Sequence, residues 1–232
     1  MKVRPARRPA PTLGSGLDLE QTRLVWRIAG LLLDYPSPET LASLDDLART
    51  AAELPAPAGP ALVTFVERIR GTDPLALRAR YVETFDLRRR HSLHLSYFAY
   101  GDTRKRGMAL LRFKHAYREA GADLGDIELP DHLPVVLEFA AVVDPEAGRK
   151  LLFEYHPVLE LLRRALQEAD PDYALLLDAI AATLPDLDAA SRRRVIELAA
   201  AGPPEEEVGL DTFAMDPALE EHLGADSKGG RR

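Results

Sequence analysis

Basic, aromatic and histidine side chains are concentrated in residues 78–118 of a chain that is acidic as a whole. This segment holds eleven arginines and lysines against three acidic residues. Its ring-bearing residues lie between the cations: Tyr81, Phe85, His91, His94, Tyr97, Phe98, Tyr100, Phe113, His115 and Tyr117. Arginine forks bind phosphate or carboxylate groups, and exposed aromatic rings bind apolar side chains. The segment therefore predicts either a surface that binds an anion or a polypeptide, or a solvated basic helix face with aromatic core residues between the charges.

Two histidines of this segment, His91 and His94, lie three residues apart. That spacing could present two metal ligands on one helix face. No carboxylate lies immediately beside them, and the chain contains no HExxH motif and no paired Glu-x-x-His motifs. We therefore interpret both as ordinary surface or core histidines and expect no metal site.

The motifs of the common catalytic sites are missing from the sequence. There is no phosphate-binding GxxxxGK segment, no GxGxxG and no GxSxG. The absence of cysteine excludes a disulfide framework, a cysteine-ligated zinc or iron–sulfur site and a thiol nucleophile. We expect no catalytic residues and no enzymatic activity.

A second candidate site is the sequence ELPDHLP at residues 128–134. Pro130 favours an extended backbone, Asp131 can cap a helix, and Pro134 is tolerated in a first helical turn. One interpretation is simply a well-capped helix. In the other, Asp131 and His132 lie at a helix N-terminus where they meet the polar groups of a partner.

Helical signals run through the elements that must position these residues. Asp18 and Gln21 form a predicted capping box, and an N-cap residue followed by proline recurs at Ser37–Pro38, Asp73–Pro74, Asp144–Pro145 and Asp170–Pro171. Periodic apolar residues predict helices within 74–85, 103–120, 131–143, 171–184 and 188–201, and across 145–169 with a break or kink at Pro157. No alternating pattern predicts a strand. The expected fold is an all-α, single helical-bundle domain over residues 17–201.

The two ends of the chain differ from this domain in composition. Residues 1–16 are basic and rich in proline and glycine, which predicts a flexible arm, and they lack the apolar run of a secretory or twin-arginine signal. Residues 202–232 hold eight acidic against three basic residues, which predicts a mostly disordered tail. No segment of the 232 residues approaches the roughly 20 apolar residues of a membrane span, so we expect a cytoplasmic protein without membrane insertion. The net charge of −7 does not favour nucleic-acid binding.

Residues 81–120 followed by 128–141 resemble the NarJ branch of the TorD/DmsD family of redox-enzyme maturation chaperones, the delta chains of respiratory nitrate reductases. The family signature, a Pro-x-Asp-His-type motif, is matched by Pro130, Asp131 and His132. The resemblance implies a non-enzymatic chaperone with the all-helical TorD-like fold. It implies binding of the N-terminal segment of the apo catalytic (alpha) subunit of nitrate reductase, and assistance to molybdenum cofactor insertion before membrane docking.

The same resemblance implies the partners and the cofactor. The chaperone assists delivery of bis-molybdopterin guanine dinucleotide to its client without binding a cofactor stably, and molybdenum cofactor biosynthesis proteins are further candidate partners. An amphipathic client peptide would need an apolar groove with polar ends. By residue type, we expect such a groove to be lined by Tyr81, Phe85, Leu93, Tyr97, Phe98 and Tyr100, with Leu133 and Leu137 opposite. The residues expected to bind the partner peptide are Tyr81, Phe85, Arg88, Arg89, Arg90, Tyr97, Tyr100, Asp102, Arg104, Arg106, Pro130, Asp131, His132 and Pro134.

Two other function classes follow from the residues alone. The basic stretch at residues 78–118 suits a helical nucleic-acid- or anion-binding module, which salt-dependent binding would reveal. A metal-dependent helical enzyme is the third class, and it is disfavoured because paired ligand motifs are absent.

Overall fold

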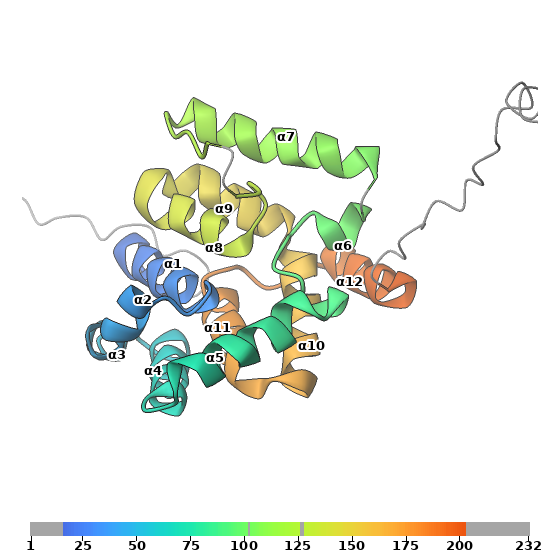
Figure 1. Ribbon diagram of the computed structural model, residues 1–232. Helices are drawn as coiled ribbons and strands as arrows, with labels where there is room; N and C mark the ends of the chain where they lie inside the picture. The colour runs from blue at the N-terminus through green and yellow to red at the C-terminus, as the bar shows by residue number, and fades with distance from the viewer. Residues whose placement is uncertain (1–15, 102, 126–127, 203–232) are drawn as a thin grey trace, which may run out of the picture.

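The computed structural model describes residues 16–101, 103–125 and 128–202. Over these residues the chain forms twelve α-helices and no strand, which confirms the predicted all-α domain (Figure 1). The α-helices are α1 (Leu19–Leu33), α2 (Pro38–Ala42), α3 (Leu44–Ala52), α4 (Ala58–Ile69), α5 (Pro74–Tyr81), α6 (Tyr97–Tyr100), α7 (Arg104–Glu119), α8 (Leu133–Glu138), α9 (Pro145–Glu154), α10 (His156–Ala169), α11 (Pro171–Ala181) and α12 (Ala189–Ala201). A π-helical turn follows α5 (η1, Val82–Asp86) and another follows α8 (η3, Phe139–Val143), and Arg89–His91 form a 3₁₀ turn (η2). The predicted arm and tail lie outside the described residues, except for Gly16 and Gly202.

Five of the predicted helix starts, at Asp18, Ser37, Asp73, Asp144 and Asp170, are found in the structure. At α1 the carboxylate of Asp18 accepts the Gln21 N–H at 2.8 Å, while the Gln21 side chain accepts the Asp18 N–H at 3.0 Å. The predicted cap side chains also accept N–H bonds at the starts of α2, α5, α9 and α11, each with proline in the first turn. The break between α9 and α10 falls at Tyr155, and Pro157 lies in the first turn of α10, as predicted.

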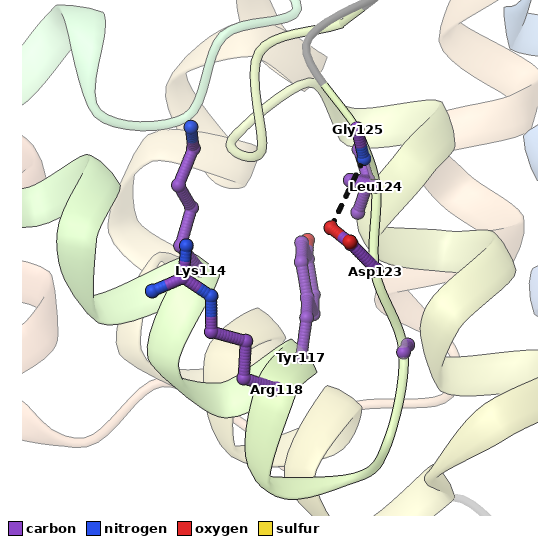
Figure 2. A pocket seen from close by; sticks show the side chains of 7 residues that line it. Lys114, Tyr117, Arg118, Asp123, Leu124 and Gly125 are labelled. Atoms are coloured by element: carbon purple, nitrogen blue, oxygen red, sulfur yellow. Dashed lines mark hydrogen bonds between the residues drawn. The ribbon is translucent and has the colours of Figure 1, made fainter.

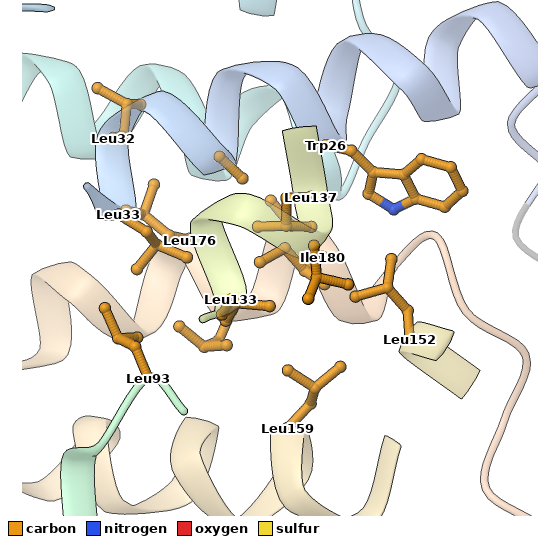
Figure 3. Close-up of a cluster of buried hydrophobic side chains, with 14 of the residues drawn as sticks. Trp26, Leu32, Leu33, Leu93, Leu133, Leu137, Leu152, Leu159, Leu176 and Ile180 are labelled. Atoms are coloured by element: carbon orange, nitrogen blue, oxygen red, sulfur yellow. The ribbon is translucent and has the colours of Figure 1, made fainter. Parts of the chain in front are cut away.

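Helix α11 lies at the centre of the bundle and packs on α1, α4 and α10. Its apolar side chains join those of α1, α8, α9 and α10 in a core that includes Trp26, Leu33, Leu133, Leu137, Leu152, Leu159, Leu176 and Ile180 (Figure 3). The indole N–H of Trp26 donates to Thr183 Oγ1 at 2.8 Å, so the buried ring leaves no polar atom unsatisfied. No helix among the described residues is both long and apolar enough to cross a membrane.

Helices α1 and α8 approach each other closely at a glycine. A Cβ built on Gly30 would lie 3.3 Å from the Cβ of Leu137, tighter than ordinary side-chain contact. This contact anchors α8 against the core, and the second candidate site, residues 128–134, leads into the first turn of that helix.

Candidate functional site

The two segments singled out in the sequence meet at a short antiparallel bridge between His94 and His132. The N–H of Leu95 donates to the carbonyl of Asp131 at 3.0 Å, and the N–H of Leu133 donates to the carbonyl of Leu93 at 2.9 Å. The fold thus joins the loop before α6 to the loop before α8. We call this contact the histidine bridge.

The buried side chain of Asp131 stabilises the histidine bridge. This side chain is fully buried, and its Oδ2 accepts the backbone N–H of Ser96 at 3.0 Å and the Ser96 hydroxyl at 2.5 Å. The expectation that Asp131 caps the following helix is wrong, because α8 begins at Leu133 with His132 at its N-cap and no side-chain cap bond. The physical reason is that the buried donors of Ser96, distant in sequence, take the carboxylate that a helix N-terminus would otherwise use.

The charges at the bridge are set by burial and proximity. His94 Nδ1 lies 3.4 Å from Asp131 Oδ1, and both atoms lack a well-formed hydrogen bond, so we treat this approach as an electrostatic contact. Burial alone would raise the pKa of Asp131, but the contacts from His94 and Ser96 outweigh it and hold that pKa below its usual value.

His132 is held in its neutral form. Burial, and then the nearby charge of His94, lower the pKa of His132 to about 4, against a weaker opposing effect of Asp131. The rings of His94 and His132 are 5.1 Å apart between centroids, and 17% of the His132 side chain is exposed. At neutral pH the bridge therefore offers a neutral imidazole edge to solvent beside a buried carboxylate.

Tyr117 supports the bridge from α7. Its buried hydroxyl donates to the carbonyl of Pro130 at 2.6 Å, which fixes the residue before Asp131. Tyr117 also lines a hollow of about 250 Å³. Figure 2 shows its ring between Lys114 and Arg118 of α7 on one side and Asp123, Leu124 and Gly125 on the other. Pro134 is buried in the first turn of α8.

A larger hollow of about 500 Å³ lies between η2, α6, α10 and α12. Arginines rim it, and its walls are mainly apolar. We call it the arginine groove, and its lining residues are Arg88, Arg90, His91, Phe98, Leu161, Arg164, Ala165, Glu168, Ala169, Leu198, Ala199 and Gly202.

Most of the aromatic residues expected to line a groove lie in the core instead. Tyr81 and Phe85 are each 6% exposed, and the Phe85 ring packs on Tyr173 of α11 with centroids 4.8 Å apart. Leu93, Leu133 and Leu137 are likewise buried, and so is Tyr97. The reason is that α5, η1 and the loop before α6 pack directly on α11 and α8, which leaves no open channel at these side chains. Phe98 is mostly buried yet lines the arginine groove, and Tyr100 is partly exposed.

The basic stretch divides into structural and exposed arginines. Arg80 bonds both Asp170 and Asp172, and Arg78 donates to the carbonyl of Pro36, so these two stabilise the fold. The arginines of η2 and its neighbour, Arg88, Arg89 and Arg90, are exposed. In the part of the chain that the structure describes, neither Arg88 nor Arg90 forms a salt bridge with a carboxylate.

The remaining predicted residues lie near the start of α7. Arg104 is exposed on its first turn, and the guanidinium of Arg106 lies over the Tyr97 ring, 5.4 Å from its centroid. Asp102 lies outside the described residues. Arg104 and Arg106 thus flank α6 but do not line the arginine groove.

Ser96 and the groove-lining residues of α10 and α12 were missed in the sequence. Ser96 gives no sequence signal for its bond to Asp131. Leu161, Arg164 and Leu198 lie on α10 and α12, where helical periodicity alone predicts ordinary bundle packing. Proximity to η2 in the fold is what makes them walls of the arginine groove.

His91 and His94 point to different partners. His91 is buried, with Nδ1 2.9 Å from the carbonyl oxygen of Thr84, while His94 faces Asp131. Over residues 16–101, 103–125 and 128–202 there is no group of three or more potential metal ligands.

Comparison with known proteins places residues 51–177 in the family model described as nitrate reductase delta subunit. The chain is 35% identical over 172 residues to the probable nitrate reductase molybdenum cofactor assembly chaperone NarJ of Bacillus subtilis, covering 74% of this chain and 94% of that protein. It is 33% identical over 156 residues to the nitrate reductase molybdenum cofactor assembly chaperone NarJ of Escherichia coli, covering 66% of each chain.

A longer relative matches with higher identity. The nitrate reductase-like protein NarX of Mycobacterium tuberculosis is 44% identical over 160 residues, or 69% of this chain. The match spans only 24% of the NarX length.

Proposed function

The chain belongs to the nitrate reductase delta subunit family, and from that membership we propose that it is a cytoplasmic chaperone for assembly of a respiratory nitrate reductase. Its client is the N-terminal segment of the apo catalytic subunit. Binding keeps the client open to insertion of bis-molybdopterin guanine dinucleotide and delays membrane docking. Molybdenum cofactor biosynthesis proteins are the further partners in this scheme. As a member of an assembly-chaperone family, the chain is not an enzyme.

The observation that carries the client-binding proposal is the arginine groove. Its apolar walls, including Leu161 and Leu198, suit one face of an amphipathic peptide, and Arg88 and Arg90 can orient the peptide through its acidic or carbonyl groups. The turn η2, which lines the groove, ends at His91, three residues before His94 of the histidine bridge. In this proposal, the histidine bridge holds the groove-bearing segment in place, and the exposed edge of His132 is a secondary contact.

This assignment changes the roles of the predicted residues. Arg88, Arg89 and Arg90 stay candidates for direct contact with the client peptide. Tyr100, Arg104 and Arg106 are further candidates. Tyr81, Phe85, Tyr97, Pro130, Asp131 and Pro134 act by packing and positioning, since their side chains are buried.

The test is a calorimetric titration of the full chain with a synthetic peptide from the N-terminus of the nitrate reductase catalytic subunit of the same organism. We expect saturable binding with a negative heat-capacity change, because apolar surface becomes buried. A scrambled peptide of the same composition is the control and should not bind. Equal binding of both peptides, or of neither, would contradict recognition of this segment.

Strongly salt-dependent binding of DNA or RNA by the same preparation would favour the alternative nucleic-acid-binding function. The structure gives that function less support than the sequence does, because Arg78, Arg80 and Arg112 are engaged within the domain.

A further inference from the structure

The C-terminal end of α12 forms one wall of the arginine groove. Leu198 and Ala199 line the groove, and so does Gly202, the last residue that the structure describes. Residues 203–232 therefore start at the groove itself.

The sequence that follows Gly202 matches the chemistry of the groove. Two prolines come first, then Glu205, Glu206 and Glu207, and then apolar residues spaced along 208–215, namely Val208, Leu210, Phe213 and Met215. Glu207 is only five residues after Gly202, so even a fully extended chain could not carry the three glutamates more than about 18 Å from Gly202. Acidic groups followed by apolar groups are what a groove with an arginine rim and aliphatic walls would bind.

Only some of the groove arginines are available to bind an acidic segment. Arg164 already bonds Glu160 at 2.6 Å, and Glu168 is an acidic group of the groove lining. Arg88 and Arg90 are exposed and have no carboxylate partner among the described residues. They are the cations that the glutamates would neutralise.

We propose that residues 205–215 dock into the arginine groove of their own chain and compete there with the client peptide. The competition half of this proposal rests on the proposed function, whereas the docking half does not. A tethered segment has an effective concentration in the millimolar range. If the segment binds the groove with a Kd of about 0.1–1 mM, it weakens client binding about twofold to tenfold.

Docking is tested first by disulfide cross-linking, which the cysteine-free sequence makes specific. Ala169 is an exposed residue of the groove lining, and Ala214 lies in the proposed segment. In the full chain carrying A169C and A214C, we expect a monomeric cross-linked product under mild oxidation at low salt. Adding E205Q, E206Q and E207Q should slow its formation at least fivefold, while the matched tail control E220Q with E221Q should leave the rate unchanged. A rate insensitive to all five substitutions, or a product formed only between two chains, would overturn the proposal.

Competition is tested by titrating the client peptide into the full chain and into the E205Q/E206Q/E207Q variant. We expect the variant to bind the client twofold to tenfold more tightly at low salt, with the difference shrinking as salt screens the charges. Specific cross-linking without any client binding would refute the proposed function and leave docking supported. Client binding of equal affinity in both proteins, with charge-independent cross-linking, would refute the docking and leave the proposed function standing.

Discussion

The carboxylate of Asp131 accepts both polar hydrogens of Ser96, its backbone N–H at 3.0 Å and its hydroxyl at 2.5 Å. Both residues are fully buried. Because buried donors without acceptors are costly, this pair joins the loop before α6 to the loop before α8 in one arrangement. The main role of Asp131 is therefore to hold these two loops in position.

Replacing Asp131 by alanine should lower the free energy of unfolding by about 2–4 kcal/mol, because two buried donors of Ser96 lose a charged acceptor. Urea denaturation monitored by circular dichroism measures this loss. Ser96→Ala in addition to Asp131→Ala should cost less than the sum of the two single changes, since the partners are removed together. Additive losses would show that the pair does not act as a unit.

The neutral state of His132 makes stability depend on pH. Its pKa of about 4 in the folded chain lies below the ordinary value near 6.5, so its contribution is fully present above pH 6.5 and is lost as the pH falls towards 4. Between pH 7 and pH 4 the free energy of unfolding of the unmodified chain, measured by urea denaturation, should fall by about 3 kcal/mol more than that of the His132→Gln variant. Other groups at the bridge, His94, Asp131 and Glu128, are present in both proteins, so the difference between the two pH profiles isolates His132. Parallel profiles would contradict a buried neutral imidazole.

Arg80 links α5 to the junction of α10 and α11. It bonds Asp170, whose side chain is 9% exposed, and Asp172 at 2.8 Å. Arg80→Ala would leave a buried carboxylate without its cation, so we expect a loss of about 3 kcal/mol in urea denaturation. The matched control is Arg112→Ala, which breaks a pair with Glu154 that is 62% and 37% exposed and should cost less than about 1 kcal/mol. Equal losses would show that burial does not decide the contribution.

Two glycines should respond in opposite ways to alanine. A Cβ on Gly148 would lie 2.3 Å from the Cβ of Ala140, where α9 packs on η3. Gly148→Ala should therefore cost about 1–3 kcal/mol through overpacking. Gly107 lies exposed within α7, and a Cβ there would meet no atom within 4 Å apart from its neighbours in the helix backbone, so Gly107→Ala should stabilise by about 0.5–1 kcal/mol. Thermal unfolding of both variants measures whether stability falls or rises. A Gly148→Ala variant more stable than the unmodified chain would contradict the close packing of α9 on η3.

The helices can be located from the sequence because the signals at their starts are local. The capping side chain, the proline and the apolar period at Asp73, Asp144 and Asp170 all lie within a few residues of the helix they start. The start of α8 was misplaced because the acceptor needed by Ser96, 35 positions before Asp131, decides it. That competition is a tertiary contact, which no local pattern records.

The groove could not be located for a related reason. A buried Phe85 and a groove-lining Phe98 have the same residue type and lie in the same basic stretch. Which of them faces a hollow depends on where α10, α11 and α12 pass, and those helices come more than 50 residues later. Composition indicated a surface rich in arginine, and the fold then separated Arg80, which pairs with Asp170 and Asp172, from Arg88 and Arg90 at the groove.

Filling the arginine groove should block client binding without loss of stability. Ala165 lines the groove from α10 and is only partly buried, so Ala165→Trp places an indole in the hollow of about 500 Å³ and removes no core contact. We expect client affinity in calorimetric titration to fall at least tenfold, with a free energy of unfolding within about 0.5 kcal/mol of the unmodified chain. Ala190→Trp is the matched control, because Ala190 is exposed in the first turn of α12 and does not line the groove. If Ala165→Trp and Ala190→Trp bind the client equally well, the peptide lies elsewhere. The edge of His132 at the histidine bridge then becomes the next surface to substitute, because 17% of that side chain is exposed beside the Pro-x-Asp-His-type motif.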